Sequence, residues 1–185
     1  MALLEVLTRC NRRPKMLMEN IRSLMAQSDP DWEQTFIVDT ATRGIGASYE
    51  ALAAQPVRGE YIWILDDDDE CIWRPLVADV RRLVAEKPET QVIMLRMNHG
   101  AELGVLPDDK HWGGPPVEGR IGCSAFIVRR DAWQRHAGAF TPGHYASDFD
   151  FICSVWREEP VIVWHDVIAS RAQRGRMMGA TEQTQ

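Results

Sequence analysis

The sequence predicts an α/β protein in which a mostly parallel central sheet is flanked by helices on both faces. Strand-like and helix-like segments alternate along the first half of the chain, the connections between them are short, and one strand-like segment is apolar throughout. Such a rhythm places helices on the faces of the sheet and ligands beyond the carboxyl ends of its strands. With 185 residues, 45% of them hydrophobic, the chain can bury about 70% of its unfolded surface, and we expect a single compact domain.

The first half of the chain supplies four expected strands, at residues 3–8, 35–38, 61–65 and 92–97. A helix begins at Pro14, which is favoured in the first helical turn, and its apolar residues recur at helical spacing up to Met25. A glycine turn at 44–46 leads into a helix over 47–54, and a third helix is expected over 75–86.

The second half is less regular. Residues 98–119 are rich in His, Gly and Pro and predict a long loop, in which Trp112 either stacks on a sugar or base or is simply the buried residue of a surface connector. The remaining expectations are strands at 121–128 and 161–164, a short helix near 131–135, a helix over 147–157 and a polar C-terminal tail over 171–185.

An acidic run follows the most apolar strand: residues 61–65 lead directly into Asp66, Asp67, Asp68, Asp69 and Glu70. Adjacent carboxylates strongly disfavour each other's ionisation unless a counter-charge is present. Mg²⁺ or Mn²⁺ meets this need and usually takes its remaining ligands from phosphates and water. The run therefore indicates a metal and a phosphorylated substrate, with a solvated acidic loop as the alternative.

Composition excludes several other classes. The net charge of −6 and pI of about 5.4 argue against binding duplex nucleic acid by broad phosphate neutralisation. No apolar run approaches the roughly 20 residues of a membrane span, and the first residues lack signal-peptide features, so we expect a cytoplasmic protein with no stable membrane insertion. The four cysteines are widely spaced, which favours free thiols over a zinc site or disulfides.

Six segments together resemble the family 2 glycosyltransferases of the GT-A fold. They are TRCNRRP at 8–14, VD at 38–39, GASYEAL at 46–52, GEYIWILDDDD at 59–69, GCSAFIVRR at 122–130 and SDFD at 147–150. The resemblance implies a Rossmann-like GT-A domain over 1–170, with a nucleotide-sugar-binding half (1–98) and an acceptor half (99–170). It also implies an enzyme that moves a sugar from a nucleotide-diphosphate donor to an acceptor hydroxyl, using Mn²⁺ or Mg²⁺ bound through a DxD motif.

The same resemblance assigns roles in donor binding. Asp68 matches the last Asp of the DxD motif and is expected to bind the metal, with Asp66 or Asp67 taking the ribose or a metal-bound water. Asp39 matches the residue that hydrogen-bonds the base. Thr8 and Arg12 lie where the first loop could touch the base and the diphosphate, although Arg12 is equally consistent with a solvated surface charge.

The remaining assignments concern catalysis. Asp148 matches the catalytic base of an inverting transfer, but Ser147 stands where the family has Glu, and an Asp at a helix start is also typical of an N-cap. Asp150 is the competing carboxylate. His165, at the end of the last expected strand, could complete the metal shell as a His does in some relatives, or be structural.

Two other functions stay open. A nucleotidyltransferase also uses paired carboxylates at strand ends, although the first loop here has Arg but no Gly, and a non-catalytic nucleotide-sugar binding module would fit the small size and Ser147. The acceptor is also open: a glycan, a protein, a lipid-linked sugar or a modified nucleic acid.

Overall fold

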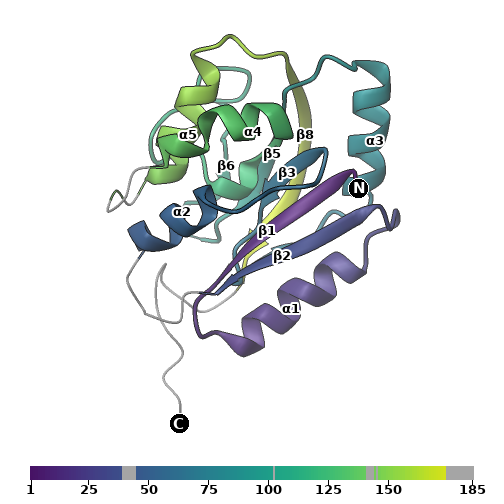
Figure 1. Ribbon diagram of the computed structural model, residues 1–185, viewed down its shortest axis with the longest axis vertical. Helices are drawn as coiled ribbons and strands as arrows, with labels where there is room; N and C mark the ends of the chain where they lie inside the picture. Colours follow the sequence, from purple (N-terminus) through teal and green to yellow (C-terminus); the bar gives the residue numbers. More distant parts are fainter. Residues whose placement is uncertain (39–44, 102, 141–143, 145, 174–185) are drawn as a thin grey trace.

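One sheet organises the protein (Figure 1). The computed structural model describes residues 1–38, 45–101, 103–140, 144 and 146–173. Within these ranges the strands are β1 (Leu4–Cys10), β2 (Trp32–Val38), β3 (Tyr61–Ile64), β4 (Asp69–Cys71), β5 (Val92–Asn98), β6 (Val105–Leu106), β7 (Phe126–Arg129) and β8 (Ile162–Ala172). Their order is β2-β1-β3-β7-β5-β8-β4, with β6 paired to β5.

The helices are α1 (Pro14–Met25), α2 (Ile45–Ala53), α3 (Leu76–Glu86), α4 (Arg130–His136) and α5 (Ser147–Trp156), with 3₁₀ turns η1 (Cys123–Ala125) and η2 (Ala137–Ala139). None of the helices in the described ranges is long and apolar enough to cross a membrane. The expected α/β class and single compact domain are confirmed.

The sheet is mixed rather than mostly parallel. β1 pairs in parallel with β2 and β3, and β5 pairs in parallel with β8, whereas β7 lies antiparallel between β3 and β5. β4 and β6 are also antiparallel to their partners. Parallel pairing requires a crossover connection, usually an α-helix, and the described residues between β5 and β7 form only β6, loops and the 3₁₀ turn η1. The two strands therefore run in opposite directions.

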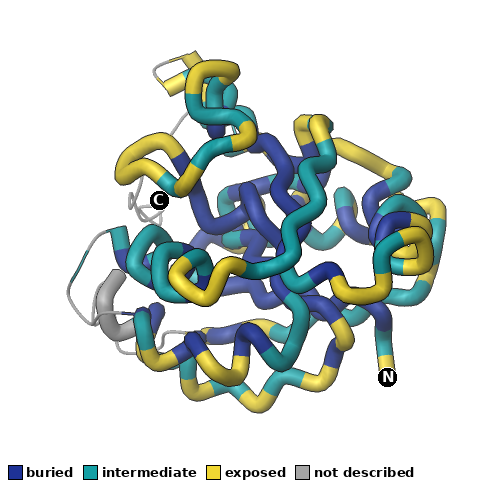
Figure 2. The backbone as a smooth tube through the Cα atoms, turned by 90° about the horizontal axis from the view of Figure 1, so that it is seen from above, coloured by how far each residue is buried: buried dark blue, intermediate teal, exposed yellow. Residues whose placement is uncertain are grey.

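Both faces of the sheet are apolar, as the unbroken run in β3 predicts. Side chains alternate along the strand, so that Tyr61 and Trp63 pack in one cluster with residues of α1 and α3. Ile62 and Ile64 pack in the other, with residues of α2, α4 and α5. In Figure 2 the buried segments lie at the centre, and the exposed turns of the helices form much of the rim.

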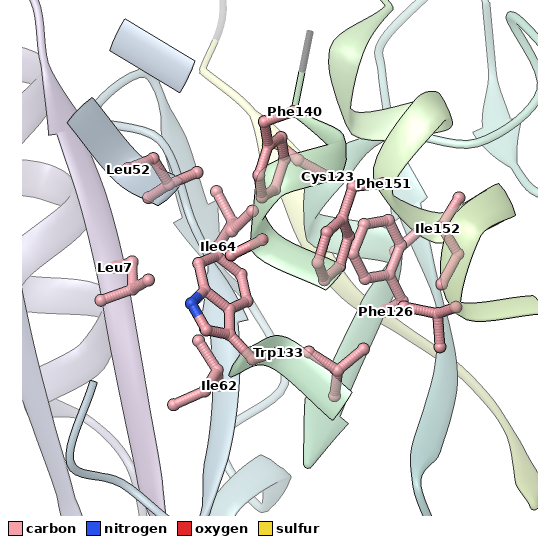
Figure 3. Packing of buried hydrophobic residues seen from close by; sticks show 14 of the residues in the cluster. Leu7, Leu52, Ile62, Ile64, Cys123, Phe126, Trp133, Phe140, Phe151 and Ile152 are labelled. Atoms are coloured by element: carbon pink, nitrogen blue, oxygen red, sulfur yellow. The ribbon is translucent and has the colours of Figure 1, made fainter. Parts of the chain in front are cut away.

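Aromatic packing fixes the start of α5 (Figure 3). Phe140 and Phe151 stack with their ring centroids 4.5 Å apart, and Trp133 lies 5.2 Å from Phe151. Phe151 is completely buried, which contributes roughly 1.5–3 kcal/mol by removing apolar surface from water. The first turn of α5, one turn before Phe151, is therefore held firmly against the sheet.

Two segments differ from expectation. The strand expected over 161–164 is β8, which continues to Ala172 because it pairs with β5 on one side and β4 on the other. His165 is therefore in mid-strand, and the first residues of the expected tail are part of the sheet; residues 174–185 lie outside the described ranges. The end of the acidic run also forms a short strand, β4, which the sequence did not predict.

Candidate functional site

The acidic run lies at the edge of the sheet where β1 and β3 end. Asp67 N–H donates to the carbonyl oxygen of Arg9 at 3.2 Å, and Asp69 N–H donates to Asp66 O at 2.9 Å, which closes a turn. The side-chain amide of Asn20, in α1, donates to the carbonyls of Asp66 and Asp69 at 2.9 and 3.0 Å. These bonds hold the backbone of the run in a single conformation, and we call residues 66–69 the acidic turn.

Arg9, at the end of β1, neutralises Asp66. Its Nε donates to Asp66 Oδ1 at 2.7 Å, and a terminal nitrogen pairs with Asp66 Oδ2, so the contact is bidentate. The guanidinium also lies over the ring of Tyr49, in α2, with 4.0 Å between its central carbon and the ring centroid. This ion pair is on the sheet face that α2 covers.

Arg13, which immediately precedes α1, holds the next two carboxylates. Its two terminal nitrogens pair with Asp67 and Asp68, and the backbone N–H of Asn11 donates to Asp67 Oδ2 at 2.7 Å. Burial raises the pKa of Asp67 to about 6, against the lowering effects of the Asn11 N–H and of Arg13. Arg12 is exposed and has a φ of +50°, in the left-handed region.

Asp69 is the carboxylate without a partner. The residue is only 7% exposed, and within the described ranges no hydrogen bond or ion pair reaches its side-chain oxygens. One ligand atom each from Asp66, Asp69 and Cys123 lie within 4.8 Å of one another. Four aspartates facing two arginines leave a formal excess of two negative charges. The residues present therefore fit a divalent cation in both donor atoms and charge.

Asp148, in the first turn of α5, belongs to the same site. Burial raises the pKa of its carboxyl to about 6; the Arg9 charge opposes this rise and the Asp66 charge adds to it. Asp148 Oδ1 accepts a hydrogen bond from the N–H of Phe149 at 2.9 Å. Asp150 pairs instead with His144, whose Nδ1 lies 2.6 Å from Asp150 Oδ2. Asp148 is half-buried, and a carboxyl with a pKa near neutrality can accept a proton in the physiological range.

Other predicted residues do not join this cluster. Thr8 is fully buried, and its hydroxyl oxygen accepts a hydrogen bond from Gln34 Nε2 at 2.8 Å. His165 lies within β8, not at its end, and its Nε2 lies 2.9 Å from Asp79 Oδ2 in α3.

Trp112 packs in the long loop, 4.9 Å from the Trp164 ring and 4.4 Å from the guanidinium of Arg96. Asp39 lies outside the described residues. The structure thus brings together Asp66, Asp67, Asp68 and Asp148, and places the side chains of Thr8, Trp112 and His165 in other contacts.

Sequence reasoning missed Arg9 and Arg13, which neutralise the acidic turn, and Cys123, whose sulfur lies beside it. It recognised Asp69 as part of the acidic run but gave it no role of its own. A charge count offered a usable signal, because four adjacent carboxylates beside a strand end require basic partners. The segment TRCNRRP holds three arginines, but its composition does not show which of them turn inwards.

Structural comparison shows the fold of the GT-A glycosyltransferases. The chain matches a crystal structure of S. aureus TarS 1–349 in complex with UDP-GlcNAc with a TM-score of 0.74 at 15% identity, over 96% of this chain and 60% of that one. It also matches the mannosyltransferase PcManGT from Pyrobaculum calidifontis in complex with GDP-Man and Mn²⁺, with a TM-score of 0.69 at 13% identity, over 95% of this chain and 58% of that one.

The protein spans about 60% of the length of these structures. No protein-family model and no curated protein matches the sequence.

Proposed function

We propose that the protein transfers a glycosyl group from a nucleotide-diphosphate sugar to an acceptor hydroxyl, with Mn²⁺ or Mg²⁺ as cofactor. The observation that carries this proposal is a single arrangement on a GT-A fold. An acidic turn with a formal excess of two negative charges shares one site with a half-buried carboxyl whose pKa is about 6. The first feature suits a cation and a diphosphate, and the second suits a general base.

Donor binding would use the acidic turn and its arginines. When bound, the cation supplies Lewis-acid stabilisation of the leaving diphosphate. Asp68 is the proposed metal ligand; its side chain is 25% exposed, and a diphosphate that binds Arg13 would release it. Asp66 or Asp67 would take the ribose or a metal-bound water, and Asp39 the base. With these roles, residues 1–98 would bind the donor and residues 99–170 would bind the acceptor.

Asp148 would act as the base. The acceptor O–H proton moves to the Asp148 carboxylate as the acceptor oxygen bonds to the anomeric carbon. The bond from that carbon to the diphosphate oxygen breaks, and its electron pair leaves with the diphosphate. Attack from the face opposite the leaving group inverts the anomeric configuration. Ionised Asp148 is therefore required, and Asp150, which pairs with His144, is less suited to the role.

The test is donor hydrolysis, because an active transferase usually leaks to water. We expect the purified protein to release nucleoside diphosphate from at least one member of a panel of UDP- and GDP-sugars when Mn²⁺ is present. Chelation with EDTA should stop the release and Asp148→Asn should reduce it. Thermal-shift screening of the same panel would identify the preferred donor. Absence of both binding and hydrolysis across the panel would overturn the proposal.

One observation favours a second function, that of a nucleotide-sugar binding module. Ser147 replaces the Glu expected before the base, and Asp148 Oδ1 already accepts a hydrogen bond from the N–H of Phe149 in its own helix, although the N-cap of α5 is Ala146. The panel separates the two functions, because a binding module would give thermal shifts with Mn²⁺ and a donor but no release of nucleoside diphosphate.

A further inference from the structure

The sheet has two edge strands, β2 and β4, and they differ in how they are protected. β4 has three residues, two of them acidic, and its Glu70 pairs with Arg171 of β8. Short length and charge are common features that keep a strand edge from pairing with another chain. β2 has seven residues, of which only Glu33 is charged, and its one strand partner in the described ranges is β1. Its outer row of backbone N–H and C=O groups is therefore open to a further strand.

Apolar side chains accompany this open edge on the face where α1 packs beside β2 (Figure 1). Gln34 identifies that face, because its Nε2 donates to Asn20 Oδ1 in α1 at 2.7 Å. Side chains alternate along a strand, so Phe36 and Val38 point to the same face as Gln34. Phe36 is 44% exposed and Val38 is 65% exposed. Two large apolar side chains thus face solvent at the edge of the sheet.

α1 adds a second apolar row on the same side. The hydroxyl of Ser23 accepts a hydrogen bond from the N–H of Cys71 at 2.9 Å, which shows the side of the helix that faces β4. At 100° per residue, Met18 and Met25 lie on the opposite side of α1, towards β2. They are 48% and 72% exposed. With half-buried neighbours in α1, they extend the surface that we call the apolar edge, which consists of Leu17, Met18, Ile21, Met25, Phe36 and Val38.

We propose that the apolar edge is the interface of a symmetric homodimer, in which β2 of one copy pairs antiparallel with β2 of a second copy. A two-fold axis perpendicular to the sheet keeps both α1 helices on one face, so the two apolar rows are buried together. Opposed residues of an antiparallel pair point to the same face, so the axis passes through a residue, and Thr35 is the middle one. The dimer does not rest on the proposed function.

Pairing about Thr35 is self-complementary. Val38 of one copy falls opposite Trp32 of the other, which sets an exposed apolar side chain against a half-buried aromatic ring. Glu33, the only charged residue of β2, falls opposite Ile37, so no like charges meet across the strands. A second copy therefore satisfies the open backbone edge at no electrostatic cost within the strand pair.

The same axis centres the row on α1. Asn20 contacts Gln34, the neighbour of Thr35, and lies between Met18 and Met25 in the helix. Rotation about the axis reverses α1, so Met18 of one copy approaches the Met25 end of the other. One strand and one helix flank make an interface at the small end of the usual range, about 1,200 Å² in total, so we expect a reversible dimer with a Kd on the order of 10 µM.

The test is sedimentation velocity of the full chain from about 1 to about 100 µM, a range that brackets this Kd. We expect a shift from monomer to dimer and no larger species, because two-fold pairing uses both open edges. Phe36→Lys and Met25→Lys, at exposed positions, should each weaken dimerisation about 10-fold or more. Ile72→Lys is the matched control: Ile72 is a 39% exposed apolar residue beside β4, and this variant should dimerise like the wild type.

Thr35→Cys tests the position of the axis. The two copies of residue 35 would have their Cα atoms about 4.5–5.5 Å apart, within reach of a disulfide, so mild oxidation should give a covalent dimer. Glu33→Cys is the control, because its two copies would lie about 14 Å apart along the strands, too far for a disulfide. The wild type, which contains the native free thiols, gives the background of the oxidation. Circular dichroism checks the folding of every variant.

Three results would overturn the inference: a wild type that stays monomeric at about 100 µM, a dimer that Ile72→Lys disrupts but Phe36→Lys does not, or a disulfide in Glu33→Cys but not in Thr35→Cys. The first needs no variant, so misfolding cannot obscure it. A monomeric wild type that binds an extended peptide along β2 would assign the apolar edge to a different partner and reject the homodimer.

Discussion

Arg9 and Arg13 carry equal charges to one acidic turn but are used differently. Arg9 gives both sides of its fork to a single carboxylate and lies against the Tyr49 ring, on the sheet face of α2. Arg13 divides its fork between Asp67 and Asp68, and its buried Nε has no hydrogen-bond partner in the described ranges. Both oxygens of Asp66 are paired with Arg9, whereas Arg13 is divided between two carboxylates and keeps one N–H unpaired among the described residues. Under the proposed function, Arg13 is therefore the guanidinium expected to bind the diphosphate.

Removal of Arg13 is expected to have the largest effect. Arg13→Met leaves two buried carboxylates without their counter-charge, which should lower the free energy of unfolding by about 3–5 kcal/mol, the usual loss when one partner of a buried ion pair is removed. Urea denaturation at neutral pH measures the loss. The matched control is Arg12→Met, at the exposed neighbouring position, which should change stability by less than about 0.5 kcal/mol. Equal losses in the two variants would show that Arg13 does not support the turn.

The second prediction concerns the face that Arg9 shares with Asp148. Asp148→Asn should retain donor affinity, measured by calorimetry with Mn²⁺, and lower transfer and donor hydrolysis by about 10²-fold or more, the contribution of a general base. Asp150→Asn is the control, because Asp150 pairs with His144. If Asp150→Asn is the damaging change, the roles of the two carboxylates are reversed; if neither matters, the transferase proposal fails.

These contrasts also show how far the sequence reaches. The apolar run of β3 predicted a strand buried on both faces, and its abrupt end predicted the acidic turn. The sequence could not show that Arg9 and Arg13 pair with the acidic turn while Arg12 is exposed, because no signal in the composition marks these directions or the left-handed backbone at Arg12. It also failed to show that, of the four aspartates in the acidic turn, Asp69 would have no side-chain partner among the residues that the structure describes, since that depends on how two guanidiniums divide four carboxylates.

Long-range strand pairing decided the surroundings of the other candidate residues, which the sequence did not predict. His165 follows an apolar segment and looks like the end of a strand, but pairing with β5 and β4 carries β8 on to Ala172. His165 then contacts Asp79 of α3, a residue 86 positions away. Trp112 was recognised as an aromatic residue in a long loop, but its partners Arg96 and Trp164 come from β5 and β8. Such contacts depend on register, which local sequence does not specify.

The third prediction separates the geometry of Arg9 from its charge. Arg9→Lys keeps the positive charge but loses the bidentate contact with Asp66 and the flat contact with Tyr49. We expect a loss of about 1.5 kcal/mol in the free energy of unfolding, the value of one hydrogen bond to a charged group. Arg22→Lys, at an exposed α1 position paired with Glu19, should be nearly neutral in the same urea experiment. An equally neutral Arg9→Lys would mean that the fork geometry adds nothing.

The smallest effect, a shift in a pH midpoint, tests whether Arg9 and Asp148 interact. Burial raises the pKa of Asp148 to about 6, so the carboxyl is protonated and inactive as a base below that pH and ionised above it. The rate of donor hydrolysis should therefore rise with pH, by about tenfold per unit below the midpoint, and level off above it. Arg9 favours the ionised form, so Arg9→Met should move the midpoint upwards, whereas Arg9→Lys, which keeps the charge, should leave it nearly unchanged. The same proton affects stability, because the folded state binds it more tightly than the unfolded chain does. The free energy of unfolding should therefore fall as the pH rises from about 4 to about 6, and Asp148→Asn should remove this pH dependence. A rate midpoint that stays in place in Arg9→Met would mean that Asp148 does not sense Arg9, and that the two halves of the site act independently.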